Sequence, residues 1–382
     1  MRNSSRGDVD PFIVMDVLDA ARRHEAAGRS IVHMEIGQPG TGAPRAALDR
    51  LAKDMQDDAL GYTVALGRPE LRERISRHYR DWYGVDVPPE RIVVTAGASG
   101  AFLLAFSALF DTDARVGLAE PCYPSYRQIL KALGMQPVGI AAEFENRFQP
   151  VPADIAANRL DGLIVASPAN PTGTMLTKSE IAALAEACQA TGAALVSDEI
   201  YHGVGTDAPA SALQVTDQVV VINSFSKYFS MTGWRVGWMV VPDDMVRQVE
   251  RLAQNMFICA ANASQRLAFH TMDCDHDLRG YARGYDENRR LMLEGLPKAG
   301  FTRFAPPDGA FYIYADVSDL TDDSLAFSTE LLDNAGVAVT PGLDFDPVRG
   351  GKWVRFSYAG STRHIAEGLR RLTDYMSRRS RP

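Results

Sequence analysis

The sequence SFSKYFSMTGWR (residues 224–235) places one lysine, Lys227, between the apolar runs QVVVIN and VGWMVV. Runs of this length and composition predict buried strands. A lysine between two such strands is costly to bury unless it is paired or deprotonated. The ordinary alternative is a loop lysine whose amine extends to solvent. Asp198 ends another apolar run, ALVSD, and Arg235 follows in the quoted stretch, so three charged groups favour a functional site over that alternative.

Short apolar runs alternate with helical patterns from about residue 91 onward. This order predicts an α/β fold: a large domain with a mostly parallel sheet covered by helices on both faces, and a smaller α+β domain. We expect the large domain over residues 45–280 and the small C-terminal domain over residues 281–382. The N-terminal segment, residues 12–44, joins them, and its helix is expected to pack against the small domain.

Polar or small residues follow several of the predicted strands. In open parallel sheets, ligands bind at the carboxyl ends of the strands, so these groups are expected to converge on one crevice. They are residues 97–99, 121–123, 167–173, 198–201 and 224–227. In TAGASGAF (residues 95–102) a strand leads into a helix whose free N–H groups could hold an anion. Ser224, Ser226 and Arg235 are further donors suited to phosphate.

The composition narrows the class of protein. The 382 residues are 46% hydrophobic and 23% charged, with a net charge of −8, which disfavours a nucleic-acid partner. The four cysteines form no CxxC pair, so we expect no disulfide framework and no metal site, and a cytoplasmic location. No apolar run is long enough to span a bilayer, and no signal peptide is recognised.

The stretch SFSKYFSMTGWRVGW resembles the cofactor-attachment motif of class I/II pyridoxal-phosphate-dependent aminotransferases, which belong to the fold-type-I superfamily. Six further stretches are similar to family motifs and occur in the expected order over nearly the whole chain. They are YTVALGRPELR, VTAGASGAF, PCYPSY, SPANPTG, SDEIY and RFSYAG. Any one of them is weak evidence, but seven in order are specific.

The resemblance implies pyridoxal 5′-phosphate as the cofactor and assigns roles around its ring. Lys227 would form the imine with the cofactor aldehyde and later move the proton at the substrate Cα. Asp198 would keep the pyridine nitrogen protonated, so that the ring accepts carbanion charge. Asn170 and Tyr201 would donate to the phenolic oxygen, and Tyr123 would stack on the ring. Read without the family, Asn170 is a turn residue and Tyr123 a packing residue.

The resemblance also implies how the phosphate is held. Backbone N–H groups of Ala98 and Ser99 would bind it, with Ser224 and Arg235 adding hydrogen bonds and charge. Tyr62 would reach the phosphate of a neighbouring subunit, so a homodimer with shared sites is expected. The alternative for Tyr62 is an ordinary loop aromatic.

For the substrate, the resemblance implies that Arg355 binds the α-carboxylate through two parallel hydrogen bonds, with Gly37 and Asn170 alongside. Arg355 alternates with Trp353 and Phe356, so an exposed charge on an edge strand is the competing interpretation. No arginine can be assigned to a side-chain carboxylate, which leaves specificity for aspartate open.

The function implied is that of an aminotransferase in amino acid metabolism. It would move the amino group of an L-amino acid, aspartate or another, to a 2-oxo acid such as 2-oxoglutarate by a ping-pong aldimine and ketimine mechanism. One alternative is a β-lyase of the same fold, because the same electron sink serves elimination. Another is a non-catalytic protein that senses the cofactor, which the presence of both Lys227 and Asp198 disfavours.

Overall fold

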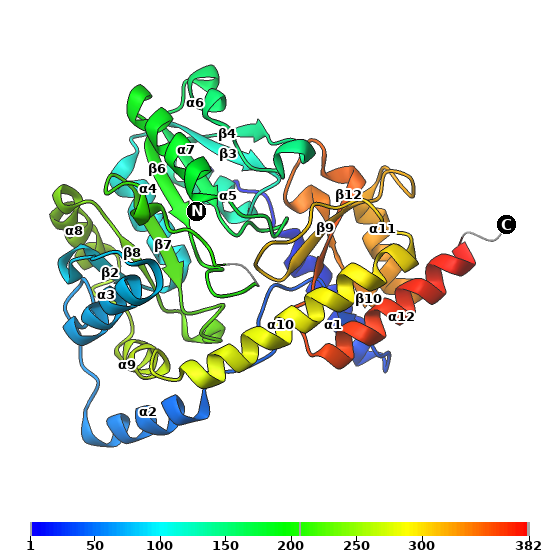
Figure 1. Ribbon diagram of the computed structural model, residues 1–382, viewed down its shortest axis with the longest axis horizontal. Coiled ribbons are helices and arrows are strands. Elements are labelled where there is room, and N and C mark those ends of the chain that lie inside the picture. Colours follow the sequence, from blue (N-terminus) through cyan, green and yellow to red (C-terminus); the bar gives the residue numbers. More distant parts are fainter. Residues whose placement is uncertain (1, 206–207, 380–382) are drawn as a thin grey trace.

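A seven-stranded sheet forms the centre of the larger part of the computed structural model, which describes residues 2–205 and 208–379 (Figure 1). Its order is β2-β8-β7-β6-β5-β3-β4, and β8 is antiparallel to both of its neighbours while the other pairs are parallel. The strands are β2 (Ile92–Thr95), β3 (Arg115–Glu120), β4 (Gln136–Ala141), β5 (Gly162–Ala166), β6 (Ala194–Asp198), β7 (Val220–Ser224) and β8 (Gly237–Val240). The predicted α/β fold with a mostly parallel sheet is confirmed.

Apolar side chains on both faces explain why the central strands are buried throughout. Along β7, Val220 and Ile222 belong to a core that includes Phe106 of α4 (Gly97–Leu109). Val221 between them belongs to a second core with Leu184 of α7 (Lys178–Thr191). Successive strand residues point to opposite faces of a sheet, so a run of branched apolar residues fills both layers at once.

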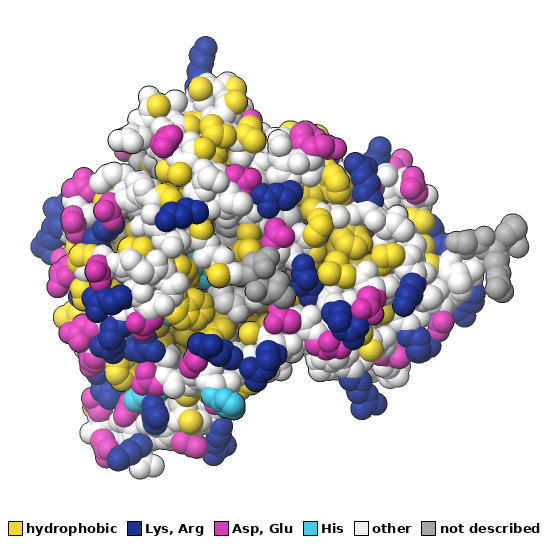
Figure 2. Space-filling model, viewed as in Figure 1, with side chains coloured by type: hydrophobic (Ala, Val, Ile, Leu, Met, Phe, Trp, Pro, Cys, Tyr) yellow, Lys and Arg dark blue, Asp and Glu magenta, His cyan; other side chains and the backbone are white. Residues whose placement is uncertain are grey.

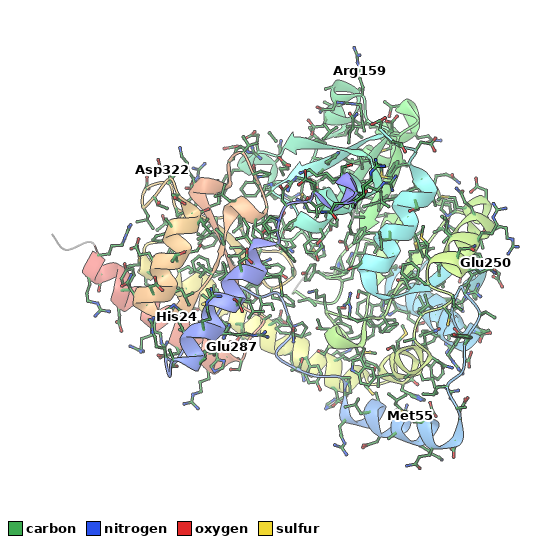
Figure 3. The ribbon with its side chains drawn as sticks, turned by 180° about the vertical axis from the view of Figure 1, so that it is seen from behind. His24, Met55, Arg159, Glu250, Glu287 and Asp322 are labelled. Atoms are coloured by element: carbon green, nitrogen blue, oxygen red, sulfur yellow. The ribbon has the colours of Figure 1, made fainter. Side chains whose placement is uncertain are left out.

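Helices of the large part pack on both faces of this sheet (Figure 1). They are α2 (Arg45–Asp57), α3 (Pro69–Tyr83), α4 (Gly97–Leu109), α5 (Pro124–Leu133), α6 (Pro152–Asn158), α7 (Lys178–Thr191), α8 (Val246–Met256) and α9 (Asn262–Thr271). Helix α2 contacts α9 and projects from the body, and Met55 marks it in the view from behind (Figure 3).

The smaller part is built on an antiparallel sheet of order β11-β12-β9, beside a parallel pair of β1 and β10. Its elements are α1 (Ile13–Ala26), β1 (Val32–His33), β9 (Tyr312–Asp316), α11 (Ser324–Glu330), β10 (Val337–Ala338), β11 (Thr340–Pro341), β12 (Trp353–Ser357) and α12 (Thr362–Arg379). Val17 and Ala21 of α1 pack with Leu332 and Ala338, as the expected contact between the N-terminal helix and the small domain requires. His24 marks α1 on this part in the view from behind (Figure 3).

Helix α10 (Asp275–Gly295) runs continuously from α9 of the large part to α12 of the small part (Figure 1). The predicted domain boundary at Tyr281 therefore lies inside a helix rather than in a linker. The division into residues 45–280 and 281–382 stays a prediction.

On the face shown in Figure 2, the described Lys and Arg side chains are interspersed with Asp and Glu. Within residues 2–205 and 208–379, no helix combines the length and apolar character needed to cross a bilayer. The same residues contain no cluster of three or more His, Cys, Asp or Glu side chains arranged to hold a metal ion.

Candidate active site

A cavity of about 220 Å³ opens at the carboxyl ends of the central strands, between the two parts of the chain. All of the predicted site residues except Tyr62 line it. They are Gly37, Ala98, Ser99, Tyr123, Asn170, Asp198, Tyr201, Ser224, Lys227, Arg235 and Arg355. The large part supplies most of them from the first residues after β2, β3, β5, β6 and β7, whereas Arg355 comes from β12.

The Lys227 amine lies inside this cavity rather than reaching the solvent. Its Nζ donates a hydrogen bond of 2.6 Å to the Gly37 carbonyl oxygen and lies 5.4 Å from the centre of the Tyr201 ring. Burial, and then the nearby Arg355 guanidinium, lower the pKa of Lys227 to about 7. A large fraction of this amine is therefore neutral near pH 7, as a nucleophile or a general base requires.

Asp198 ends β6 on the floor of the cavity and is 2% exposed. One carboxylate oxygen accepts a hydrogen bond from the Ile200 N–H at 3.1 Å, and the other accepts a short one from the Tyr126 hydroxyl. Burial raises the pKa of Asp198 to about 6, and these two donors oppose that rise. A carboxylate held in this way suits a protonated ring nitrogen as its partner.

Tyr126 is a site residue that the sequence did not reveal. It follows Tyr123 by three residues in PCYPSY, and at the start of α5 this spacing brings both rings to the cavity, 5.3 Å apart and edge to face. Helical spacing was the available signal, but only the first tyrosine of the motif was assigned a role. The Tyr123 ring also meets the Phe12 ring edge to face at 5.8 Å.

The start of α4 and Arg235 form the polar end of the cavity. Gly97 opens α4 with φ +72°, and a Cβ at this position would lie 2.6 Å from the Arg235 guanidinium. Only glycine combines this backbone conformation with such a close approach. Next to it, the Ser224 hydroxyl donates to Ser226 Oγ at 2.9 Å. Free N–H groups, two hydroxyls and a guanidinium together suit a phosphate.

Arg355 is 3% exposed and lies on β12, the central strand of its sheet, so the interpretation as an exposed edge-strand charge is wrong. Its guanidinium donates to Asn170 Oδ1 at 2.8 Å, to Thr340 Oγ1 at 3.1 Å and, in a short contact, to the Glu35 carbonyl oxygen. Asn170 and Arg355 thus link the two parts of the chain across the cavity.

Tyr312 of β9 is a second cavity residue that the sequence did not reveal. Its hydroxyl lies 2.7 Å from the Tyr201 hydroxyl, and its ring centre lies 4.4 Å from Arg355 Cζ. A Cβ on Gly37 would lie 1.6 Å from this hydroxyl. Glycine is therefore required there because a side chain would not fit, and not because the backbone has a positive φ. In the run FYIYAD, Tyr312 looks like any buried aromatic strand residue, which is why it was not assigned.

Tyr62 lies outside the cavity and is 83% exposed. Its loop is held against the first turn of α9, because Asn262 donates to the Gly61 carbonyl oxygen at 2.8 Å and Gln265 donates to Thr63 Oγ1 at 3.0 Å. The ring therefore has no contact with the cavity of its own chain.

Comparisons with known proteins show the family of the chain. The sequence pattern of the family described as aminotransferase class I and II matches residues 29–372. The chain is a class I and II aminotransferase. The valine–pyruvate aminotransferase of Mycobacterium tuberculosis is 46% identical to it over 98% of both chains.

Solved structures show the same fold for this aminotransferase. The sequence of a protein from Silicibacter pomeroyi is 63% identical to this one. Its crystal structure matches with a TM-score of 0.95 over 99% of this chain and 100% of the other. The aspartate aminotransferase of Thermus thermophilus with maleate is 29% identical, with a TM-score of 0.91 over 98% and 100% of the two chains.

Class I and II aminotransferases use pyridoxal 5′-phosphate, and so does this enzyme. The side chains present fit the group. The cavity provides an amine of lowered pKa, a buried carboxylate, and a cradle at Gly97 that a Cβ would fill. The expected cofactor is thus confirmed, and the aminotransferase interpretation holds over the lyase and the cofactor-sensing protein.

Proposed function

We propose that this aminotransferase moves the amino group of an L-amino acid with an uncharged side chain to a 2-oxo acid such as pyruvate. The observation that carries the proposal is the arrangement of Lys227, Asp198 and Arg355 around one cavity with an apolar wall. That wall is formed by Phe12, Val14, Met15 and Ile36.

Each catalytic residue has a proposed role. When bound, pyridoxal 5′-phosphate supplies the electron sink that stabilises negative charge at the substrate Cα. Asp198 would keep the proton on the ring nitrogen, Asn170 and Tyr201 would donate to the phenolic oxygen, and Tyr123 would pack on the ring. Lys227 would hold the cofactor and, once the substrate has displaced it, its free amine would move the proton between the substrate Cα and the C4′ atom of the cofactor.

Binding roles are proposed for the remaining residues. Ala98, Ser99, Ser224 and Arg235 hold the phosphate. Arg355 turns two donors toward the substrate α-carboxylate, exchanging its present contacts for a bidentate pair, and the Gly37 backbone approaches the same carboxylate.

The side-chain preference follows from the charges that line the cavity. Among the described residues lining it, the cationic side chains are Lys227, Arg235 and Arg355, and each already has a proposed partner. A side-chain carboxylate of aspartate would be desolvated against the apolar wall without a counter-charge. The similarity to a valine–pyruvate aminotransferase supports the same choice.

We further propose a homodimer that completes the site. Tyr62, Val64, Met256 and Ile258 are all about half exposed or more. The first two lie on the loop before α3, and the last two lie at the end of α8 and in the loop that follows it, which leads to Asn262, the residue that holds Gly61. Phe257, between Met256 and Ile258, approaches Gly100 of α4 beside the proposed phosphate site. A second copy covering this apolar surface would place its Tyr62 at the phosphate.

A panel assay tests the reaction and the substrate class together. The purified enzyme, loaded with pyridoxal 5′-phosphate, is given L-valine, L-alanine and L-aspartate with pyruvate or 2-oxoglutarate. We expect kcat/KM for valine to exceed that for aspartate by about tenfold or more, because desolvating an unpaired carboxylate is unfavourable. Release of a keto acid without an amino acceptor, or a preference for aspartate, would contradict the proposal.

Substitution of the lysine tests the site. Lys227→Ala should lose nearly all turnover and the visible absorption band of the bound cofactor. In the wild-type enzyme, borohydride should abolish that band and fix the cofactor covalently to Lys227. Lys53→Ala on the exposed face of α2 is the matched control and should retain both turnover and the band. Full activity of Lys227→Ala would refute the proposed site.

A further inference from the structure

Tyr312 lies at the point where the small part of the chain meets the cavity. It opens β9, pairs with Ser357 of β12 and is 1% exposed. Three groups contact it: the Tyr201 hydroxyl, the Arg355 guanidinium and the backbone of Gly37. All three belong to the proposed site, but Tyr312 itself has no role in the function proposed above.

The contact between the Tyr201 and Tyr312 hydroxyls leaves one hydroxyl hydrogen free to donate elsewhere. Burial raises the pKa of both Tyr201 and Tyr312, so each phenol keeps its proton in the working pH range. The 2.7 Å contact between the two oxygens uses one of the two hydrogens. If Tyr312 donates to Tyr201, the Tyr201 O–H is free to donate into the cavity, on the side where the Lys227 amine faces its ring.

The ring of Tyr312 has a separate contact. Arg355 Cζ lies 4.4 Å from its centre and 4.7 Å from the centre of the Phe345 ring. Arg355 Nε has no hydrogen-bond partner among the described residues. Aromatic faces attract a guanidinium and restrict its orientation, so the rings supply the support that this nitrogen lacks.

We propose that Tyr312 is a positioning residue with two separable roles. Its hydroxyl directs the Tyr201 hydroxyl toward the phenolic oxygen of the cofactor, and its ring orients the Arg355 guanidinium for the substrate carboxylate. The proposal rests on the function proposed above, because it assigns Tyr201 and Arg355 the same partners. It adds a residue of the small domain that acts on the cofactor through Tyr201 and on the substrate through Arg355.

The first experiment removes only the hydroxyl. Tyr312→Phe weakens Tyr201 as a donor, so the phenolic oxygen and the imine become more basic. The pH midpoint of the visible band of the cofactor-loaded enzyme should rise by roughly 0.5 unit, because one neutral hydrogen bond is lost. The charged groups facing the same space, which are Lys227, Asp198, Arg235 and Arg355, remain unchanged.

The matched control lies on the same strand. Tyr314 is buried two residues further along β9, and its hydroxyl has no partner among the described residues. Tyr314→Phe is therefore the same chemical change on a neighbouring residue and should leave the midpoint in place. A midpoint in Tyr312→Phe that equals the wild-type and Tyr314→Phe values would overturn the hydroxyl role.

The second experiment removes the ring. Tyr312→Leu should raise the KM of every amino donor by about five- to tenfold relative to Tyr312→Phe, since the guanidinium loses its aromatic support. Equal KM values in the two variants would overturn the ring role. Thermal unfolding and circular dichroism check folding, and Tyr312→Phe still tests the hydroxyl if Tyr312→Leu does not fold. A wild-type enzyme without a visible band would instead refute the proposed function itself.

Discussion

At the scale of the residue, the contact between Tyr126 and Asp198 predicts a pH effect. Their hydrogen bond lowers the pKa of a carboxyl that burial raises to about 6. In Tyr126→Phe the pKa of Asp198 should rise further. Asp198 would then become protonated, and lose the charge that catalysis needs, at a higher pH than in the wild-type enzyme. The acid limb of kcat/KM should move upward, and kcat/KM at neutral pH should fall roughly five- to a hundredfold. A pH–rate profile that keeps its acid limb would show that Tyr126 only fills space.

At the scale of the element, the first turn of α1 predicts a change of specificity. Met15 lines the cavity and is 50% exposed, so an arginine there can be accommodated and adds the cation that the wall lacks. Met15→Arg should raise kcat/KM for L-aspartate relative to L-valine by roughly tenfold, through a charge-assisted hydrogen bond. Met55→Arg on α2, 55% exposed and distant from the cavity, is the control. If the ratio of kcat/KM for L-aspartate to that for L-valine is equal in the two variants, α1 does not contact the substrate side chain.

The elements also show what the sequence could predict. The central strands and the groups after them were predictable, because Asp198 and Lys227 interrupt apolar runs where such residues are costly. Strand β4 was not predicted: it contains Pro137 and lies at the sheet edge, where its residues are partly exposed and the apolar run is broken. Tyr312 could not be assigned a role, because its contacts with other site residues are formed only in the tertiary fold.

At the scale of the whole molecule, the exposed loops predict a dimer that is required for full cofactor binding. Val64→Asp places a charge in the proposed interface, where it would be desolvated on association. Sedimentation should show dissociation toward monomer, with weaker retention of pyridoxal 5′-phosphate. Val348→Asp, at a still more exposed valine on the small part, should remain a dimer. A wild-type enzyme that is an active monomer at assay concentration would contradict the shared site.

The contact of Gly37 with Tyr312 also constrains the order in which the two positions can evolve. A Cβ at position 37 would lie 1.6 Å from the tyrosine hydroxyl and 2.6 Å from the ring carbon that carries it. Loss of the hydroxyl alone therefore leaves a clash, and a phenylalanine at 312 would still exclude alanine at 37. A lineage could gain a side chain at position 37 only after position 312 had become smaller than an aromatic ring. The reverse order would pass through an intermediate in which the side chain at position 37 overlaps the aromatic ring at position 312.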